Sequence, residues 1–304
     1  AFSMSVMSAQ DLATATSTYN SGAEALTMGN KAGALEYFQK ALTMAQALGD
    51  EGVDVVTNCK NAIPSVMLSL GKDLYNSKDF VGAKSKFEEA AAVAKEYGND
   101  DVVAEVESLL PTVGKRIALA KVNDAMKNKD VAGVLAGYEE AMAIDSTDAN
   151  TALKYGQFLG NAGKFDDAVK YLELAARHGQ ENNAKSVLST TFLKNAAAQL
   201  KGGKYADAVT LAEKANSYKE NAQAYLVAGQ DSQKSGKNTA AISYFEKYLA
   251  AAPTANNAAA ITFTVGALYQ QAGNKAKAVE FYKKVESDPQ FGAQAKSLIT
   301  SLSK

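Results

Sequence analysis

The sequence of 304 residues contains no tryptophan, one cysteine, one histidine, four prolines and two arginines. The single cysteine, Cys59, excludes an internal disulfide, and the single histidine, His178, excludes every zinc site that needs two imidazole ligands. The scarcity of proline argues against an all-β sandwich with many turns. No segment after residue 10 approaches the run of about 18 apolar residues that a membrane span requires.

The chain also has no excess of either charge, because 32 lysines and arginines balance 33 aspartates and glutamates. Such a chain has no long-range field to attract nucleic acid or an anionic membrane. The only arginines are Arg116 and Arg177, and arginine is the side chain that best recognises phosphate and guanine. We therefore expect no nucleic-acid partner. The content of 47% apolar and 21% charged residues is that of a chain that buries a core.

Motifs of catalysis and of metal or cofactor binding are missing as well. No serine has glycines two places away on both sides, and the Gly-Lys pairs lack the earlier glycine of a phosphate-binding loop. We expect Cys59 to be a packed, unreactive thiol and His178 to stand at a helix end before Gly179. The sequence thus predicts a protein that is not an enzyme, with no catalytic residue, no cofactor and no metal.

The first nine residues, Ala1 to Ala9, are uncharged, apolar and small, and they precede the polar pair Gln10-Asp11. This pattern resembles the end of a secretory signal peptide with a cleavage site after Ala9. We therefore expect a periplasmic or secreted protein of a bacterial cell envelope. The alternative is a cytoplasmic protein in which the same residues form part of a first helix.

A skeleton of small and aromatic residues recurs along the chain. One copy contains Gly229, then Gly236-Lys237, Ala241 and Phe245, and the next contains Gly266, Gly273-Asn274, Ala278 and Tyr282. Seven such copies are present, although the third, around Val131 to Ala141, departs most. The first glycine allows two helices to approach closely, and the second suits the left-handed end of a helix. The following alanines and aromatic residue form the buried stripe of a second helix.

The skeleton resembles the tetratricopeptide repeat over roughly residues 15 to 290. The resemblance implies an all-α fold, a right-handed superhelical solenoid of about seven antiparallel helix pairs with a C-terminal capping helix. This chain departs from the family pattern, because the usual tryptophan is absent and the repeat-ending proline survives only at Pro253.

The spacing of the copies predicts the domain organisation. We expect a remnant of the signal peptide at 1–9, three elongated repeats at 10–145, four regular repeats at 146–290 and a cap helix at 291–304. The additional length precedes Pro64 and Pro111. Since proline removes a helical hydrogen bond, we expect the long helices to kink or restart there.

Stacked helix pairs present their first helices on a concave surface, which solenoid proteins use to bind partners. The matching position of each first helix is apolar: Tyr19, Leu68, Leu119, Leu153, Leu193, Leu226 and Phe263. Glutamines, including Gln230 and Gln270, follow on the same helices. We therefore predict a scaffold that binds a peptide or protein segment on this face. The sequence leaves three alternatives open: a column half-buried between helices, a self-associating structural envelope protein, and an accessory subunit of an enzyme complex.

Overall fold

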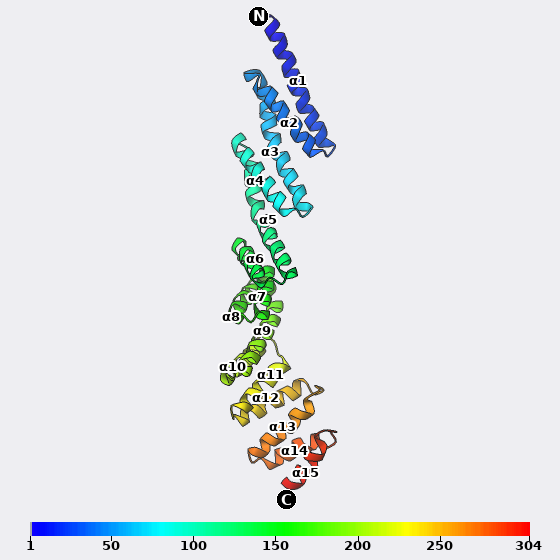
Figure 1. The fold of residues 1–304 in the computed structure, drawn as a ribbon, viewed down its shortest axis with the longest axis vertical. Helices are drawn as coiled ribbons and strands as arrows, with labels where there is room; N and C mark the ends of the chain where they lie inside the picture. Colours follow the sequence, from blue (N-terminus) through cyan, green and yellow to red (C-terminus); the bar gives the residue numbers. More distant parts are fainter. Residues whose placement is uncertain (1) are drawn as a thin grey trace. The chain divides into compact units, whose positions relative to one another are not determined.

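The computed structural model describes the backbone of residues 2–304 and the side chains from residue 9 onward. Helices make up most of the described residues, which contain no strand, and the chain divides into two compact units, Ala1–Ser146 and Thr147–Lys304 (Figure 1). The predicted all-α, helical-repeat fold is confirmed. No helix in the described part of the chain has the length and apolar character needed to cross a bilayer. The predicted signal-peptide remnant at 1–9 falls almost entirely outside the described side chains.

The first unit contains three antiparallel helix pairs, and both helices of the first two pairs also pack against the first helix of the next pair. A short 3₁₀ turn, Gly49–Gly52, precedes the third helix. The first helices of the second and third pairs are long, with 24 and 28 residues. The pairs are α1 (Phe2–Thr27) with α2 (Lys31–Gln46), α3 (Val53–Asn76) with α4 (Phe80–Tyr97), and α5 (Asp100–Lys127) with α6 (Val131–Ile144).

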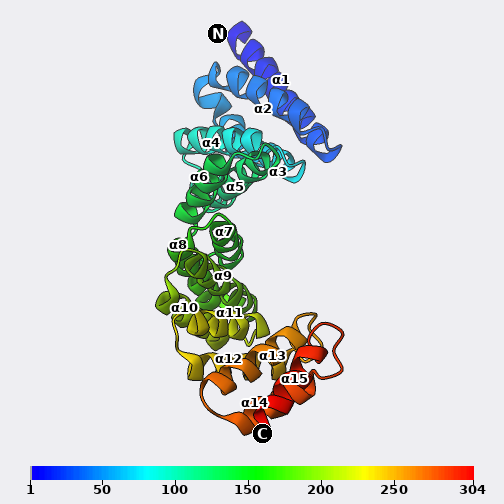
Figure 2. The same cartoon turned by 60° about the horizontal axis from the view of Figure 1, so that its bottom comes forward.

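The second unit contains four pairs and one further helix, and Figure 2 shows the two helices of a pair side by side. A kinked segment, Ala176–Gln180, in which His178 and Gly179 leave the helical conformation, joins the first two pairs directly. The pairs are α7 (Ala149–Asn161) with α8 (Phe165–Ala175), α9 (Glu181–Lys201) with α10 (Tyr205–Tyr218), α11 (Ala222–Lys234) with α12 (Asn238–Ala251), and α13 (Ala258–Gln271) with α14 (Lys275–Lys284). The predicted cap helix is α15 (Gly292–Leu302), whose Ala295 is buried against α14.

Close approach of the two helices in a pair depends on the predicted small residue. A Cβ atom added to Gly71 of α3 would lie 2.5 Å from the Phe87 ring of α4, and one added to Gly229 of α11 would lie 2.6 Å from the Phe245 ring of α12. Both rings are almost fully buried. Glycine on one helix and an aromatic side chain on the other therefore hold these two pairs together by close packing.

The long helices continue through both prolines. Pro64 lies inside α3 and Pro111 lies inside α5, and neither helix restarts there. Of the two expected outcomes, the restart is wrong, because α3 and α5 each pack against helices on both sides, which offsets the loss of one hydrogen bond. A kink at these prolines stays a prediction. In the turn of α3 that holds Pro64, the Asn61 carbonyl accepts hydrogen bonds from Ser65 Oγ at 3.0 Å and from Asn99 Nδ2 at 3.4 Å.

Candidate protein-binding cleft

The apolar column predicted to bind a partner contributes to packing within each unit. Leu68 and Leu226 are buried, with 4% and 5% of their surface exposed. The remaining five are half-buried: Tyr19, Leu119, Leu153, Leu193 and Phe263. Their contact with a partner stays a prediction, while their packing is visible within the units.

Aromatic contacts account for the burial at the two ends of this column. The Tyr19 ring lies 5.1 Å from the Phe38 ring of the same pair. Phe263 lies between Tyr282 of α14 and Phe291, which precedes α15, at 5.2 and 5.3 Å between ring centroids. Phe263 therefore joins the cap helix to the last pair.

The two glutamines of the predicted site have different environments. Gln230 of α11 is half-buried, whereas Gln270 of α13 is exposed. The Gln270 side chain accepts a hydrogen bond from the hydroxyl of Tyr282 at 2.8 Å. These residues lie on successive first helices, and neither of them lines the clefts of the second unit around Pro253, Tyr225 and Lys164.

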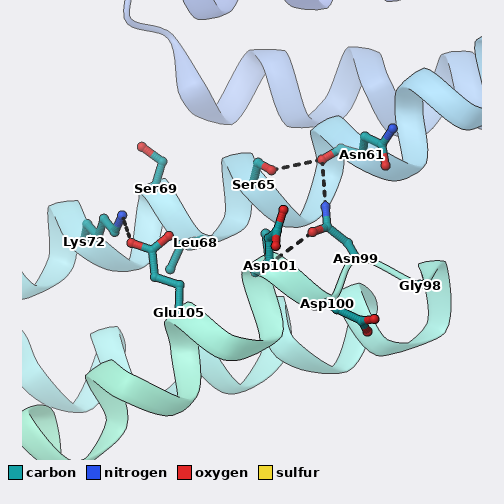
Figure 3. A pocket seen from close by; sticks show the side chains of 11 residues that line it. Asn61, Ser65, Leu68, Ser69, Lys72, Gly98, Asn99, Asp100, Asp101 and Glu105 are labelled. Atoms are coloured by element: carbon teal, nitrogen blue, oxygen red, sulfur yellow. Dashed lines mark hydrogen bonds and ion pairs between the residues drawn. The ribbon is translucent and has the colours of Figure 1, made fainter.

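A cleft of about 770 Å³ lies in the first unit between the successive first helices α3 and α5. Its α3 wall includes Ser65, Ser69 and Lys72, and Leu68 supplies an apolar contact at its base. The opposite wall is formed by the turn after α4 and the first turns of α5 (Figure 3). Of the predicted column, only Leu68 lines this cleft.

The end of the cleft near the turn is held in place by Asn99. Its Oδ1 accepts a hydrogen bond from the backbone N–H of Val102 at 3.2 Å, which caps the N-terminus of α5. Its Nδ2 donates to the Asn61 carbonyl of α3 at 3.4 Å. One amide side chain thus caps α5 and connects the two walls.

Charged groups line the other part of the cleft. Lys72 of α3 and Glu105 of α5 face each other with 2.5 Å between Nζ and Oε1, and both side chains remain nearly half exposed (Figure 3). Asp100 and Asp101 add two carboxylates from the first turn of α5. Sequence reasoning did not predict that Lys72, Glu105 and the two aspartates lie together. Lys72 and Glu105 are 33 residues apart, so no local sequence pattern predicts their contact. The length of the repeat had to be known before the two residues could be paired.

The described residues contain no cluster of side chains suited to a metal ion. No group of three or more histidine, cysteine, aspartate or glutamate side chains in this part of the chain could hold a metal ion. Cys59 is fully buried in α3, as expected, and burial raises the pKa of its thiol to about 11. A thiol with such a pKa is protonated at neutral pH and is a poor nucleophile. His178 is exposed at the end of α8, directly before Gly179 with its φ of 101°.

Comparisons with known proteins give one family match and several similar solved structures. Residues 15–48 match a sequence model of the tetratricopeptide repeat. Similar solved structures include the MamA protein (19% identity, TM-score 0.40, 60% of this chain and 94% of that one). YrrB, described as a TPR protein with an unusual peptide-binding site, has 21% identity and a TM-score of 0.37 over 58% of this chain and 88% of its own.

The PilF protein of Pseudomonas aeruginosa has 15% identity and a TM-score of 0.35, and the match covers 80% of this chain and 99% of that one. No curated protein matches the chain. The matched residues 15–48 contain the second half of α1 and all of α2, so the sequence match to the tetratricopeptide repeat falls on the first helix pair.

Proposed function

We propose that the chain is a non-enzymatic protein-interaction scaffold that binds an extended polypeptide segment in the cleft between α3 and α5. The observation that supports this proposal is the cleft itself. It lies between two successive first helices, has a volume of about 770 Å³ and combines hydrogen-bonding, charged and apolar groups. Ligand sites commonly have this size.

The lining of the cleft indicates the chemistry of the bound segment. The hydroxyls of Ser65 and Ser69 offer hydrogen bonds to a peptide backbone, and Leu68 offers one apolar contact. Asp101 and Glu105 favour a cationic side chain, because Lys72 neutralises only one of the two carboxylates. We therefore propose a segment that carries lysine or arginine.

Peptides selected from a random display library against the full-length chain test this proposal. Ser65→Arg places a bulky cation in the cleft, and Ser85→Arg places the same side chain on α4, outside it. We expect the selected peptides to lose affinity for the Ser65→Arg protein by about tenfold or more and to bind the Ser85→Arg protein normally. Equal binding to both variants would show that the cleft is not the binding site.

We also propose that the protein is exported, on the basis of the small and apolar residues before Gln10. N-terminal sequencing of the protein from its native cells tests this point. A mature chain that begins at Gln10 agrees with export, and a native chain that retains residues 1–9 contradicts it.

A further inference from the structure

The two units carry opposite charge, which the near-zero total conceals. Residues 1–146 contain 13 lysines and arginines against 20 aspartates and glutamates, whereas residues 147–304 contain 19 against 13. The formal net charges are therefore −7 and +6. Charges of this size and opposite sign attract over about a Debye length, close to 10 Å at 0.1 M salt.

The turns inside the helix pairs account for part of this difference. In the first unit, Asn30, Asp79 and Asp130 occupy the N-cap positions of the second helices, and each side chain accepts a hydrogen bond from a backbone N–H of the helix. In the second unit, Lys164, Lys204 and Lys237 occupy the same position and make no cap hydrogen bond. Lysine is a poor N-cap and places a positive charge at the positive end of the helix dipole.

These lysines lie along one edge of the second unit, because antiparallel pairs place every turn between a first and a second helix at the same end. A hydrogen bond of 3.3 Å between Asn238 and Gln271 joins two neighbouring turns of this edge. We define the basic edge by six exposed lysines for which the described structure contains no ion pair. They are Lys164, Lys201, Lys204, Lys234, Lys237 and Lys275.

Acidic residues on the basic edge are fewer. Asp166, Asp167 and Asp207 follow the turns at the starts of α8 and α10. Lys164, together with Asn195 and Gln199 of α9, lines a cleft of about 330 Å³ that also contains Asp166 and Asp167. The basic edge thus carries six lysines against these three aspartates.

The first unit has an acidic edge at the turns that connect one helix pair to the next, whereas the basic edge lies at the turns within the pairs. We define it by five exposed carboxylates, which are Asp50, Asp54, Glu96, Asp100 and Asp101. Two lysines lie nearby: Lys95 pairs with Glu107 at 3.7 Å, and the Lys60 ammonium of α3 lies 5.5 Å from the centroid of the Tyr97 ring. The acidic edge and the basic edge therefore offer complementary charges on a single chain.

We infer that copies of this chain associate head to tail, with the acidic edge of one copy docking on the basic edge of the next. The molecule that docks on each edge is a second copy of this chain, because every copy carries both of the complementary surfaces. The contact is heterologous, so each copy retains one free surface and the association continues to larger assemblies. It is electrostatic, so salt weakens it.

Sedimentation velocity of the full-length chain tests this inference. We expect the wild type to form assemblies at about 10 mM sodium chloride and to dissociate at about 500 mM. The triple variant Lys164→Asp, Lys204→Asp, Lys237→Asp should remain monomeric in both buffers. Aspartate already caps α4 and α6 in this chain, so these substitutions improve the caps and preserve the fold.

A matched control makes the same charge change away from the basic edge. Lys154→Glu, Lys283→Glu and Lys296→Glu alter exposed residues of α7, α14 and α15. We expect this control to assemble at low salt with a midpoint concentration within about threefold of the wild type, whereas the basic-edge variant should need at least about thirtyfold more protein.

Complementation then distinguishes head-to-tail contact from a symmetric dimer. Asp50→Lys with Glu96→Lys disrupts the acidic edge only, so this variant should also be monomeric alone. Mixed with the basic-edge variant, it should form one-to-one complexes that do not grow. Three results would overturn the inference: a wild type that is monomeric at low salt, assembly by the basic-edge variant, and a mixture of the two edge variants that stays monomeric.

Discussion

The two units are built from the same kind of helix pair, but polar residues at equivalent positions of the pair differ between them. Asp73 and Asp231 stand at equivalent positions, each two residues after the glycine that contacts the second helix. Asp73 is exposed and pairs with Lys31 at 2.6 Å, whereas Asp231 is fully buried and neither of its carboxylate oxygens has a hydrogen-bond partner. The repeat therefore fixes the small and aromatic residues, and its polar positions are free to differ between units.

Glycine replacement should have the largest effect and should affect both units alike. Gly71→Leu and Gly229→Leu each force a side chain into the ring of Phe87 or Phe245, and we expect each to lower the free energy of unfolding by about 3 kcal/mol or more. Chemical denaturation measures this loss.

Gly114→Ala is the control, since a Cβ at Gly114 meets only Ile144 at 3.3 Å and alanine favours the helix. A large loss from Gly71→Leu with none from Gly229→Leu would break the equivalence of the two units.

Asp231 should make stability depend on pH in a way that Asp73 does not. Burial raises the pKa of the Asp231 carboxyl from 3.8 to about 6, although Lys234 opposes the shift. The folded state then binds the proton more tightly than the unfolded state, so this stabilisation is complete below pH 3.8 and is lost as the pH rises through 6.

Asp231→Asn should therefore raise the free energy of unfolding at pH 7.5 by about 2 to 3 kcal/mol. The gain over the wild type should shrink as the pH falls from 7 to 4, which thermal unfolding across this range measures. Asp73→Asn is the control, and we expect it to change stability by about 1 kcal/mol or less because its ion pair is exposed. A gain for Asp231→Asn that stays constant with pH would contradict the account.

Exchange of the cap residues should have a smaller effect, of opposite sign in the two units. Asp79→Lys removes a cap hydrogen bond of 2.9 Å to Gly82 and should cost about 1 kcal/mol. Lys204→Asp should gain a similar amount, since it introduces the cap that the first unit already has. Denaturation midpoints of the two single variants provide the measurement, and changes of the same sign would disprove the contrast.

The smallest expected effect concerns the residue that precedes the cap. The turns of the second unit use glycine with positive φ, including Gly203 at 76°, but Lys78 and Lys129 in the first unit adopt φ of 67° and 57°. Lys78→Gly and Lys129→Gly should each stabilise the protein by up to about 1 kcal/mol, because glycine adopts this conformation without strain. Gly203→Lys should destabilise it by a similar amount, and a gain there would contradict the explanation.

Sequence reasoning predicted the helix pairs well because they depend on residues within one repeat. The glycine, turn and aromatic positions recur at nearly constant spacing, and each has one geometric purpose. The third pair was harder to recognise, because Val122 replaces the glycine of α5 and Gly137 of α6 supplies the space instead. A Cβ added to Gly137 would lie 2.6 Å from Val122. A compensating exchange between two helices leaves no periodic trace in a single sequence.

The candidate site was less predictable for a related physical reason. The apolar column was visible in the sequence, but the burial of its side chains depends on how closely neighbouring helix pairs pack. Leu68 and Leu226 proved to be buried for this reason. The cleft between α3 and α5 depends on contacts such as Lys72 with Glu105, which join different pairs. Composition also concealed the opposite charges of the two units, because the sums cancel over the whole chain.

Hydrogen exchange of the full-length chain, with and without a selected peptide, tests the central functional claim most directly. We expect the peptide to slow exchange at residues 61–72 and 98–105, the two walls of the cleft, and to leave the second unit unchanged. Protection confined to residues 147–304, or none in α3 and α5, would contradict the proposed site.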